Sequence, residues 1–344
     1  MLDEGVGTLV YDLKENRVLS FVPQKNSERQ SLLIQRGADG ETFFTFDTQS
    51  DGMSYIVERD AKGDIVSKWE TEIPKPHYPM LAMTLSPDQK NVAFITQATP
   101  PSADISEEPW RTKFHVSPPD TEDVVRIATK KGCLLKTLNE KPKGVGGLNK
   151  GIYWLSNETI ITTSHLWRDR SDQIIRYDLI TEEEKTVDYS FGWALTSNYL
   201  LPSPDNRHVL LLRKSKSHVD ILDPWTMTLV DEVQVTETVR RYANIRSAWI
   251  NNEEFLSWDS YSNKIIRYNI STRKSTLVKP GFPSSKYEIS TFSGDYFILR
   301  NDKSSGKWSY NSKTGALKKI ASYAAGCIYP LNDNIILLDR AIRP

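Results

Sequence analysis

A short strand-like motif recurs along the chain, and this repeat limits the fold more than any other feature of the sequence. Leu9–Leu13 (LVYDL), Ile175–Leu179 (IRYDL) and Ile266–Ile270 (IRYNI) share it, and a polar turn and a second short segment follow each copy. Runs rich in β-branched and aromatic residues alternate with turn residues roughly every eight to twelve positions. Because helical periodicity is almost absent, the sequence predicts an all-β protein.

A strand, a turn and a second strand precede the internal copies of this motif. Ile152–Leu155 and Thr159–Thr163 form one such pair, and Ser247–Ile250 and Glu254–Trp258 form another. The repeating unit is therefore four strands, a to d, joined by hairpins. Six complete units are predicted, over residues 29–73, 77–140, 146–188, 193–235, 243–279 and 285–321.

Two half-units remain at the ends of the chain. Residues 325–339 fit strands a and b, and residues 8–22 fit strands c and d. Pairing the two halves completes a seventh unit and removes an open sheet edge. The sequence thus predicts a single domain over residues 1–344, a seven-bladed β-propeller of four-stranded antiparallel blades. A Pro-rich loop insertion over residues 98–122 is expected in the second blade.

Short turn motifs resemble those of the WD40-like, YVTN and TolB-type propeller repeats. Leu85–Phe94 (LSPDQKNVAF) and Ser203–Leu210 (SPDNRHVL) are similar to the Ser-Pro-Asp turn of such repeats, and Val219–Val230 resembles a YVTN repeat. The chain lacks the Gly-His pair of WD40 proteins, and its one Trp-Asp pair, Trp258-Asp259, falls at the end of a strand b. The resemblance implies a binding scaffold and carries over no catalytic residue.

The composition narrows the classes of partner and the location. The 44 basic and 44 acidic side chains balance, which disfavours general attraction to nucleic acid or anionic membranes. Two cysteines suit a reducing compartment. The N-terminus lacks a signal-peptide pattern, and no apolar run reaches the ~20 residues that span a bilayer. We expect a cytoplasmic protein without membrane insertion; an exported mature form is the alternative.

No catalytic or cofactor motif is recognisable. The sequence contains no Gly-x-Ser-x-Gly elbow, no His-Glu-x-x-His and no cysteine pair with zinc spacing. Gly144–Gly151 lacks the Lys-Ser/Thr of a phosphate loop and precedes a strand. The five histidines of the chain are scattered singly along the sequence. We therefore expect no catalytic residue, no cofactor and no metal, and a non-enzymatic role is favoured.

The predicted blades sort the connections into two faces. The a–b and c–d turns share one face, with tight polar turns, and the b–c and d–a connections share the other. Arginine and lysine stand beside Trp and Tyr on the second face, which favours an acidic or phosphorylated protein or peptide as partner. The candidate binding residues are Trp110, Arg111, Lys113, Trp167, Arg168, Arg170, Arg213, Lys216, Arg240, Arg241, Trp258, Tyr261 and Arg300.

Two other functions stay open at this level. The mouth of the central channel could serve an enzyme or a small-molecule binder, and exposed rings of Trp110, Trp167 and Trp258 could stack on a glycan. The simplest alternative is that the loop charges are ordinary solvated residues.

Overall fold

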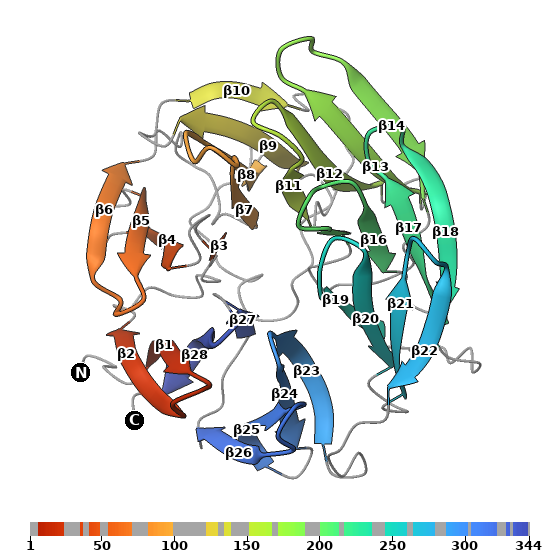
Figure 1. The fold of residues 1–344 in the computed structure, drawn as a ribbon. Helices are drawn as coiled ribbons and strands as arrows, with labels where there is room; N and C mark the ends of the chain where they lie inside the picture. Colours follow the sequence, from red (N-terminus) through yellow and green to blue (C-terminus); the bar gives the residue numbers. More distant parts are fainter. Residues whose placement is uncertain are drawn as a thin grey trace, which may run out of the picture.

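The fold is a ring of seven β-sheets, each with four antiparallel strands (Figure 1). It is taken from a computed structural model of the chain. The structure describes residues 6–23, 35–36, 41–48, 54–70, 82–98, 122–129, 134–138, 151–166, 171–189, 200–212, 217–235, 245–259, 264–278, 287–301, 304–321, 328–330 and 333–342. In this part of the chain, no helix is long and apolar enough to cross a membrane.

Each of the first six blades is one continuous stretch of sequence, as predicted. Blade one comprises β3 (Gln35–Arg36), β4 (Thr42–Thr48), β5 (Ser54–Asp60) and β6 (Ile65–Glu70). Blade two comprises β7 (Ala82–Leu85), β8 (Asn91–Ala98), β9 (Glu122–Thr129) and β10 (Leu134–Leu138). Blade three comprises β11 (Ile152–Trp154), β12 (Thr159–Leu166), β13 (Ser171–Asp178) and β14 (Glu184–Asp188).

The next three blades follow in the same order around the ring. Blade four comprises β15 (Leu200–Pro202), β16 (Val209–Leu212), β17 (His218–Asp223) and β18 (Thr228–Gln234). Blade five comprises β19 (Ile245–Trp249), β20 (Glu254–Asp259), β21 (Lys264–Asn269) and β22 (Lys274–Val278). Blade six comprises β23 (Tyr287–Ser293), β24 (Tyr296–Asn301), β25 (Ser304–Asn311) and β26 (Leu317–Ala321).

The seventh blade joins the two ends of the chain. It comprises β27 (Ile328–Pro330), β28 (Ile335–Ile342), β1 (Val6–Asp12) and β2 (Arg17–Pro23). β1 and β28 pair antiparallel from Val6↔Ile342 to Asp12↔Ile335. The predicted closure, with strands a and b from the C-terminal segment and c and d from the N-terminal one, is confirmed.

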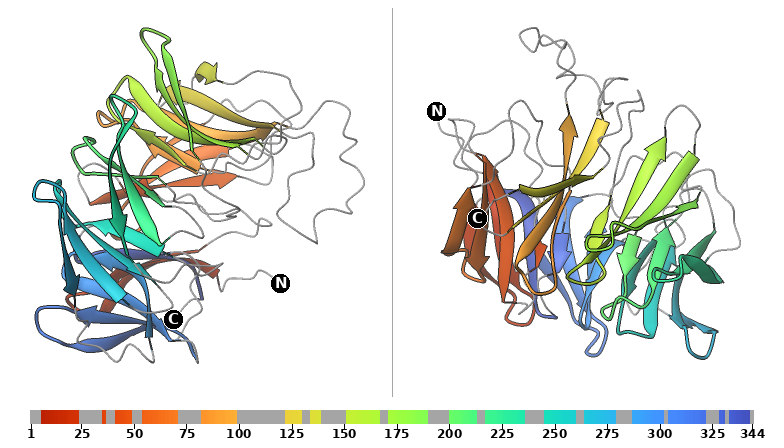
Figure 2. Two further views of the ribbon diagram at one scale, coloured as in Figure 1. Left: turned by 90° about the vertical axis from the view of Figure 1, so that its right-hand side faces the viewer. Right: turned by 90° about the horizontal axis from the view of Figure 1, so that it is seen from above.

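Strand a lies nearest the centre of the ring in each blade, and strand d lies at the rim (Figure 1). The hairpin turns between strands a and b and between c and d gather on one face of the ring (Figure 2). The b–c and d–a connections leave from the strand ends on the other face, which we call the loop face. The predicted insertion 98–122 connects β8 to β9 on the loop face, and its residues 99–121 lie outside the described residues.

The recurring Asp or Asn after the tyrosine of the repeat closes the c–d turn. The Asp178 Oδ1 accepts backbone N–H groups from Ile180 and Thr181, at 3.0 and 2.8 Å. Equivalent bonds close four other turns, to Asp12, Asn269 and Asn311 after a tyrosine and to Asp223 after Leu222. Such Asx turns replace backbone partners that a tight turn lacks, which explains why the residue type repeats.

The two Ser-Pro-Asp motifs fold into identical a–b turns. The hydroxyl of Ser86 donates to Asp88 and that of Ser203 donates to Asp205, both at 2.7 Å. Each serine Oγ also accepts a backbone N–H five residues further on, at 3.0 Å in both turns. The predicted turns are therefore confirmed, and the serine and aspartate side chains bond to each other within each turn.

The hydrophobic core lies between neighbouring blades. One cluster joins blades three, four and five, and it contains Leu155, Ile161, Leu211, Phe255 and Tyr268. The rings that recur at blade spacing belong to this packing, as predicted: Tyr11, Trp154 and Tyr268 are buried, and Tyr177 and Trp249 pack partly buried.

Two tryptophans also link adjacent inner strands by hydrogen bonds. The indole N–H of Trp154 donates to the Thr84 carbonyl of blade two at 3.0 Å. The indole of Trp249 donates to the Leu201 carbonyl of blade four at 2.8 Å. Each ring thus fills the wedge between two twisted sheets and satisfies its polar N–H there.

Candidate functional site

Most of the predicted binding residues belong to connections outside the described residues. This holds for Trp110, Arg111, Lys113, Trp167, Arg168, Arg170, Arg213, Lys216, Arg240, Arg241 and Tyr261. The described strands nevertheless fix the face from which these connections leave, and it is the loop face in every case. Arg300, near the end of strand b in blade six, is described and exposed.

Trp258 requires a correction. Its side chain is only 1% exposed, and its indole N–H donates to the Ile289 carbonyl of blade six at 3.1 Å. β20 continues to Asp259, so Trp258 lies within the strand and faces the interface between blades five and six. It is a core residue, and it offers no ring face to a protein or a glycan.

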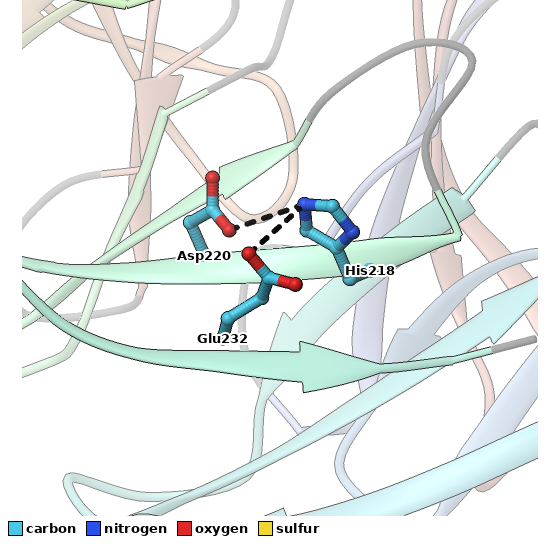
Figure 3. A group of neighbouring side chains, drawn as sticks. All are labelled: His218, Asp220 and Glu232. Carbon is cyan, nitrogen blue, oxygen red and sulfur yellow. Dashed lines mark ion pairs between the residues drawn. The ribbon is translucent and has the colours of Figure 1, made fainter.

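The best-defined polar cluster among the described residues lies on the β17–β18 hairpin of blade four. His218 and Asp220 alternate on β17 and therefore point to the same side of the sheet. Glu232 on β18 stands directly opposite Asp220 in the strand register. Figure 3 shows the three side chains converging, with the His218 Nε2 at 3.4 Å from the Asp220 Oδ1 and 3.5 Å from the Glu232 Oε2.

Blade three holds one member of this cluster in place. The phenol of Tyr189, just after β14, donates a hydrogen bond to the Asp220 Oδ2. Tyr189 is 5% exposed and Asp220 only 1% exposed, so this carboxylate sits at the interface of two blades. A buried carboxylate needs such hydrogen bonds to offset its lost hydration.

A second tyrosine makes an equivalent contact from the opposite side of blade four. Tyr268 of blade five donates to the Asp231 Oδ2 on β18. Burial raises the pKa of Tyr268 to about 12, and the hydrogen bond to Asp231 and its negative charge act in the same direction. Blade four is therefore tied by a tyrosine–aspartate pair to each of its neighbours.

The cluster lies at the loop-face end of blade four. His218 is the first residue of β17 and Gln234 is the last of β18, so both stand where the b–c and d–a connections leave. The Gln234 amide donates to the Ser217 hydroxyl at 2.9 Å, which links the two strand ends. Glu232 is 63% exposed in its side chain, so the cluster is open to solvent on one side.

Sequence reasoning treated the histidines singly and missed this cluster. The His-x-Asp spacing of His218 and Asp220 within a predicted strand c was an available signal, because alternate residues of a strand share a face. Glu232 could not be added in the same way. The β17–β18 pairing shifts register between Ile221 and Leu222, so the partner of Asp220 does not follow from counting back from the turn.

Comparisons with known proteins identify the fold and no family. No family model and no curated protein matches the sequence. The β-propeller domain of Cps50 (Swd1) from Myceliophteria thermophila is similar in structure, with 12% identity and a TM-score of 0.54, covering 91% of this chain and 97% of that one. The periplasmic gluconolactonase PpgL of Pseudomonas aeruginosa has 12% identity and a TM-score of 0.53, covering 98% and 99%.

A prolyl endopeptidase structure has 14% identity and a TM-score of 0.59, and the match covers 88% of this chain but 43% of the endopeptidase. These likenesses define the class: the chain is a seven-bladed β-propeller. The similar structures include two enzymes, a lactonase and an endopeptidase, and a propeller described by its fold, so the class leaves the activity open.

Proposed function

We propose that this chain is a non-enzymatic binding propeller that recognises a protein or peptide over its loop face. The observation that carries this proposal is the contrast between the two faces of the ring. The a–b and c–d turns close on themselves through Asx and Ser-Pro-Asp hydrogen bonds. The aspartate and serine side chains of these turns are used within the ring, which leaves fewer of them for directional contacts with a partner.

The loop face receives the longer connections. The segment between β8 and β9 is the longest of those joining strands b and c, and its sequence carries Trp110, Arg111 and Lys113. Loops held by a rigid scaffold are where recognition usually occurs. Arginine beside aromatic residues is the composition that contributes most to binding at protein interfaces.

The charge of these segments indicates the chemistry of the partner. Arg168 and Arg213 belong to the b–c connections of blades three and four, and Arg240 belongs to the d–a connection from blade four to blade five. All three connections leave toward the loop face. The net charge of the chain is zero, so a basic surface would be local rather than general. Guanidinium groups bind carboxylates and phosphates through paired hydrogen bonds. The proposed partner is therefore acidic or phosphorylated.

The experiment compares two triple charge reversals that change the net charge equally. One variant carries Arg168→Glu, Arg213→Glu and Arg240→Glu on the loop-face segments. The matched control carries Lys90→Glu, Arg207→Glu and Lys313→Glu, whose side chains are 79%, 78% and 74% exposed in turns of the opposite face. Each is used for affinity capture from lysate of cells that express the protein, followed by mass spectrometry and binding measurements with the purified partner.

We expect the wild type and the control to retain the same partner and the loop-face variant to lose it. Circular dichroism and thermal unfolding check that all three proteins are folded. Equal loss in both variants would show that only general electrostatic attraction is involved. If the wild type retains no partner, the proposal of a binding scaffold is abandoned.

A further inference from the structure

We propose that His218, Asp220 and Glu232 form a binding site for a divalent metal ion, and that the ion is zinc. The three side chains each offer one ligand atom, and these atoms all lie within 4.8 Å of one another (Figure 3). Imidazole nitrogen and carboxylate oxygen are among the ligands that zinc takes in proteins. The site goes beyond the proposed binding function, because its three ligands lie on the β17–β18 hairpin and none of them is a residue predicted to contact the partner.

The His218 side chain supplies the observation that points to a ligand. It is nine-tenths buried, and its Nε2 atom has no hydrogen-bond partner. The two carboxylate oxygens that face it are 3.4 and 3.5 Å away, beyond the usual range of about 2.7–3.2 Å for an N–H···O bond. A buried polar atom left in this state costs free energy. A cation between the three side chains would give this nitrogen a partner and bind the two carboxylates at the same time.

The spacing fits a tetrahedral ion. Zinc binds nitrogen and carboxylate oxygen at about 2.0–2.2 Å, which places two ligand atoms about 3.3–3.6 Å apart at the tetrahedral angle. Both distances from the His218 Nε2 fall in this range. The third separation, between the two carboxylates, can adjust because the Glu232 side chain is 63% exposed and reaches the site from the solvent side.

The surroundings of Asp220 support the same assignment. Its Oδ2 accepts the hydrogen bond from Tyr189, while its Oδ1 faces His218. Hydrogen bonds of this kind orient the ligating carboxylate in metal sites. Three protein ligands leave a fourth position, which water or an oxygen atom of another molecule would fill on the exposed side of Glu232.

Zinc is favoured over the other common divalent ions by the ligand set. Magnesium and calcium prefer sites made of oxygen atoms and need six or more ligands. An imidazole in a compact set of three ligands suits a transition metal. The filled d shell of zinc imposes no geometry of its own, so the ion accepts a tetrahedral arrangement. The competing explanation is that the three side chains contact one another directly and no metal binds.

The test measures zinc binding to the full chain after removal of metal with a chelator. Isothermal titration with Zn²⁺ gives the stoichiometry and affinity, and elemental analysis after dialysis gives the metal retained. The variants are Glu232→Gln and His218→Gln. Glu232→Gln is the safer one for folding because its side chain is exposed. His208→Gln is the matched control, since it removes a histidine of the same blade that stands outside the cluster.

We expect one zinc ion per chain in the wild type and in His208→Gln. Both cluster variants should bind at least tenfold more weakly, and zinc should raise the thermal unfolding temperature of the wild type but not of these variants. The proposal is overturned if the wild type retains no zinc. It is equally overturned if Glu232→Gln and His218→Gln, shown to be folded, bind zinc as tightly as the wild type.

Discussion

The substitution Gly294→Ala tests how the ring is closed. Gly294 lies in the a–b turn of blade six, and an added Cβ would stand 2.6 Å from the backbone oxygen of Asp333 and 2.7 Å from its Cβ. Asp333 precedes β28 in the closing blade, so the clash falls between the last complete blade and the blade that joins the chain ends. Backbone atoms cannot rotate away as a flexible side chain can.

Two unfavourable contributions to the folding free energy add up in the Gly294→Ala variant. Gly294 has φ of +52°, a conformation that costs an L-residue about 1–2 kcal/mol. Crowding of the Asp333 backbone adds about 1–3 kcal/mol. The sum, about 2–5 kcal/mol, is a large part of the ~5–15 kcal/mol that stabilises a typical domain.

Gly315→Ala is the matched control for the backbone term. Gly315 has φ of +72°, and an added Cβ there would meet nothing within 4 Å. We expect this variant to lose only about 1–2 kcal/mol. Urea unfolding followed by tryptophan fluorescence gives both free energies. Equal losses for Gly294→Ala and Gly315→Ala would refute the reasoning that the two blades touch at this point.

Three further substitutions probe the packing between blades and the turns. Trp258→Phe should lower the free energy of unfolding by about 1–3 kcal/mol, because the buried Ile289 carbonyl loses its donor; an unchanged urea midpoint would argue against the core position. Tyr268→Phe should make the protein less sensitive to alkali. The pKa of Tyr268 is raised to about 12 in the folded state, against about 10 in an unfolded chain. The stabilisation that protonated Tyr268 contributes is therefore complete below pH ~10 and is lost as the pH rises toward 12. Unfolding free energies measured between these pH values should fall less steeply in the variant than in the wild type. Asp178→Ala should cost about 1 kcal/mol at neutral pH. The Thr181 backbone N–H lowers the pKa of that carboxyl most, so its stabilisation is present above the unfolded pKa and is lost as the pH falls through the lower, folded one. The difference in unfolding free energy between the wild type and Asp178→Ala should therefore shrink as the pH falls. A difference that stays constant at all pH values would contradict this account.

The fold could be predicted from the sequence because its signals are local. Each blade repeats the same order of strand, turn and strand, and the Asp or Asn after the tyrosine of strand c is required by an Asx turn in several blades. The incomplete units at the two ends of the chain indicated the closure that β1 and β28 make. None of these predictions depends on which side chains contact one another between blades.

The candidate site could be predicted only in part, because it depends on such contacts. Trp258 was assigned to a loop because it stands near a strand end, yet the side of the sheet that it faces makes it a core residue. The contact of Asp220 with Tyr189 joins residues of two different blades, and no sequence motif includes both of them. Both depend on the twist and register of neighbouring sheets, which a single sequence does not specify.

The pairing of β1 with β28 determines how the molecule responds to mechanical force. Val6 and Ile342 stand opposite each other at the outer ends of the two strands. A pull on both chain ends therefore loads the hydrogen bonds between these strands one after another, starting at this pair, and does not stretch them all in parallel. The blade that seals the ring is thus expected to unzip first, at a low force, while the six continuous blades still hold their strands.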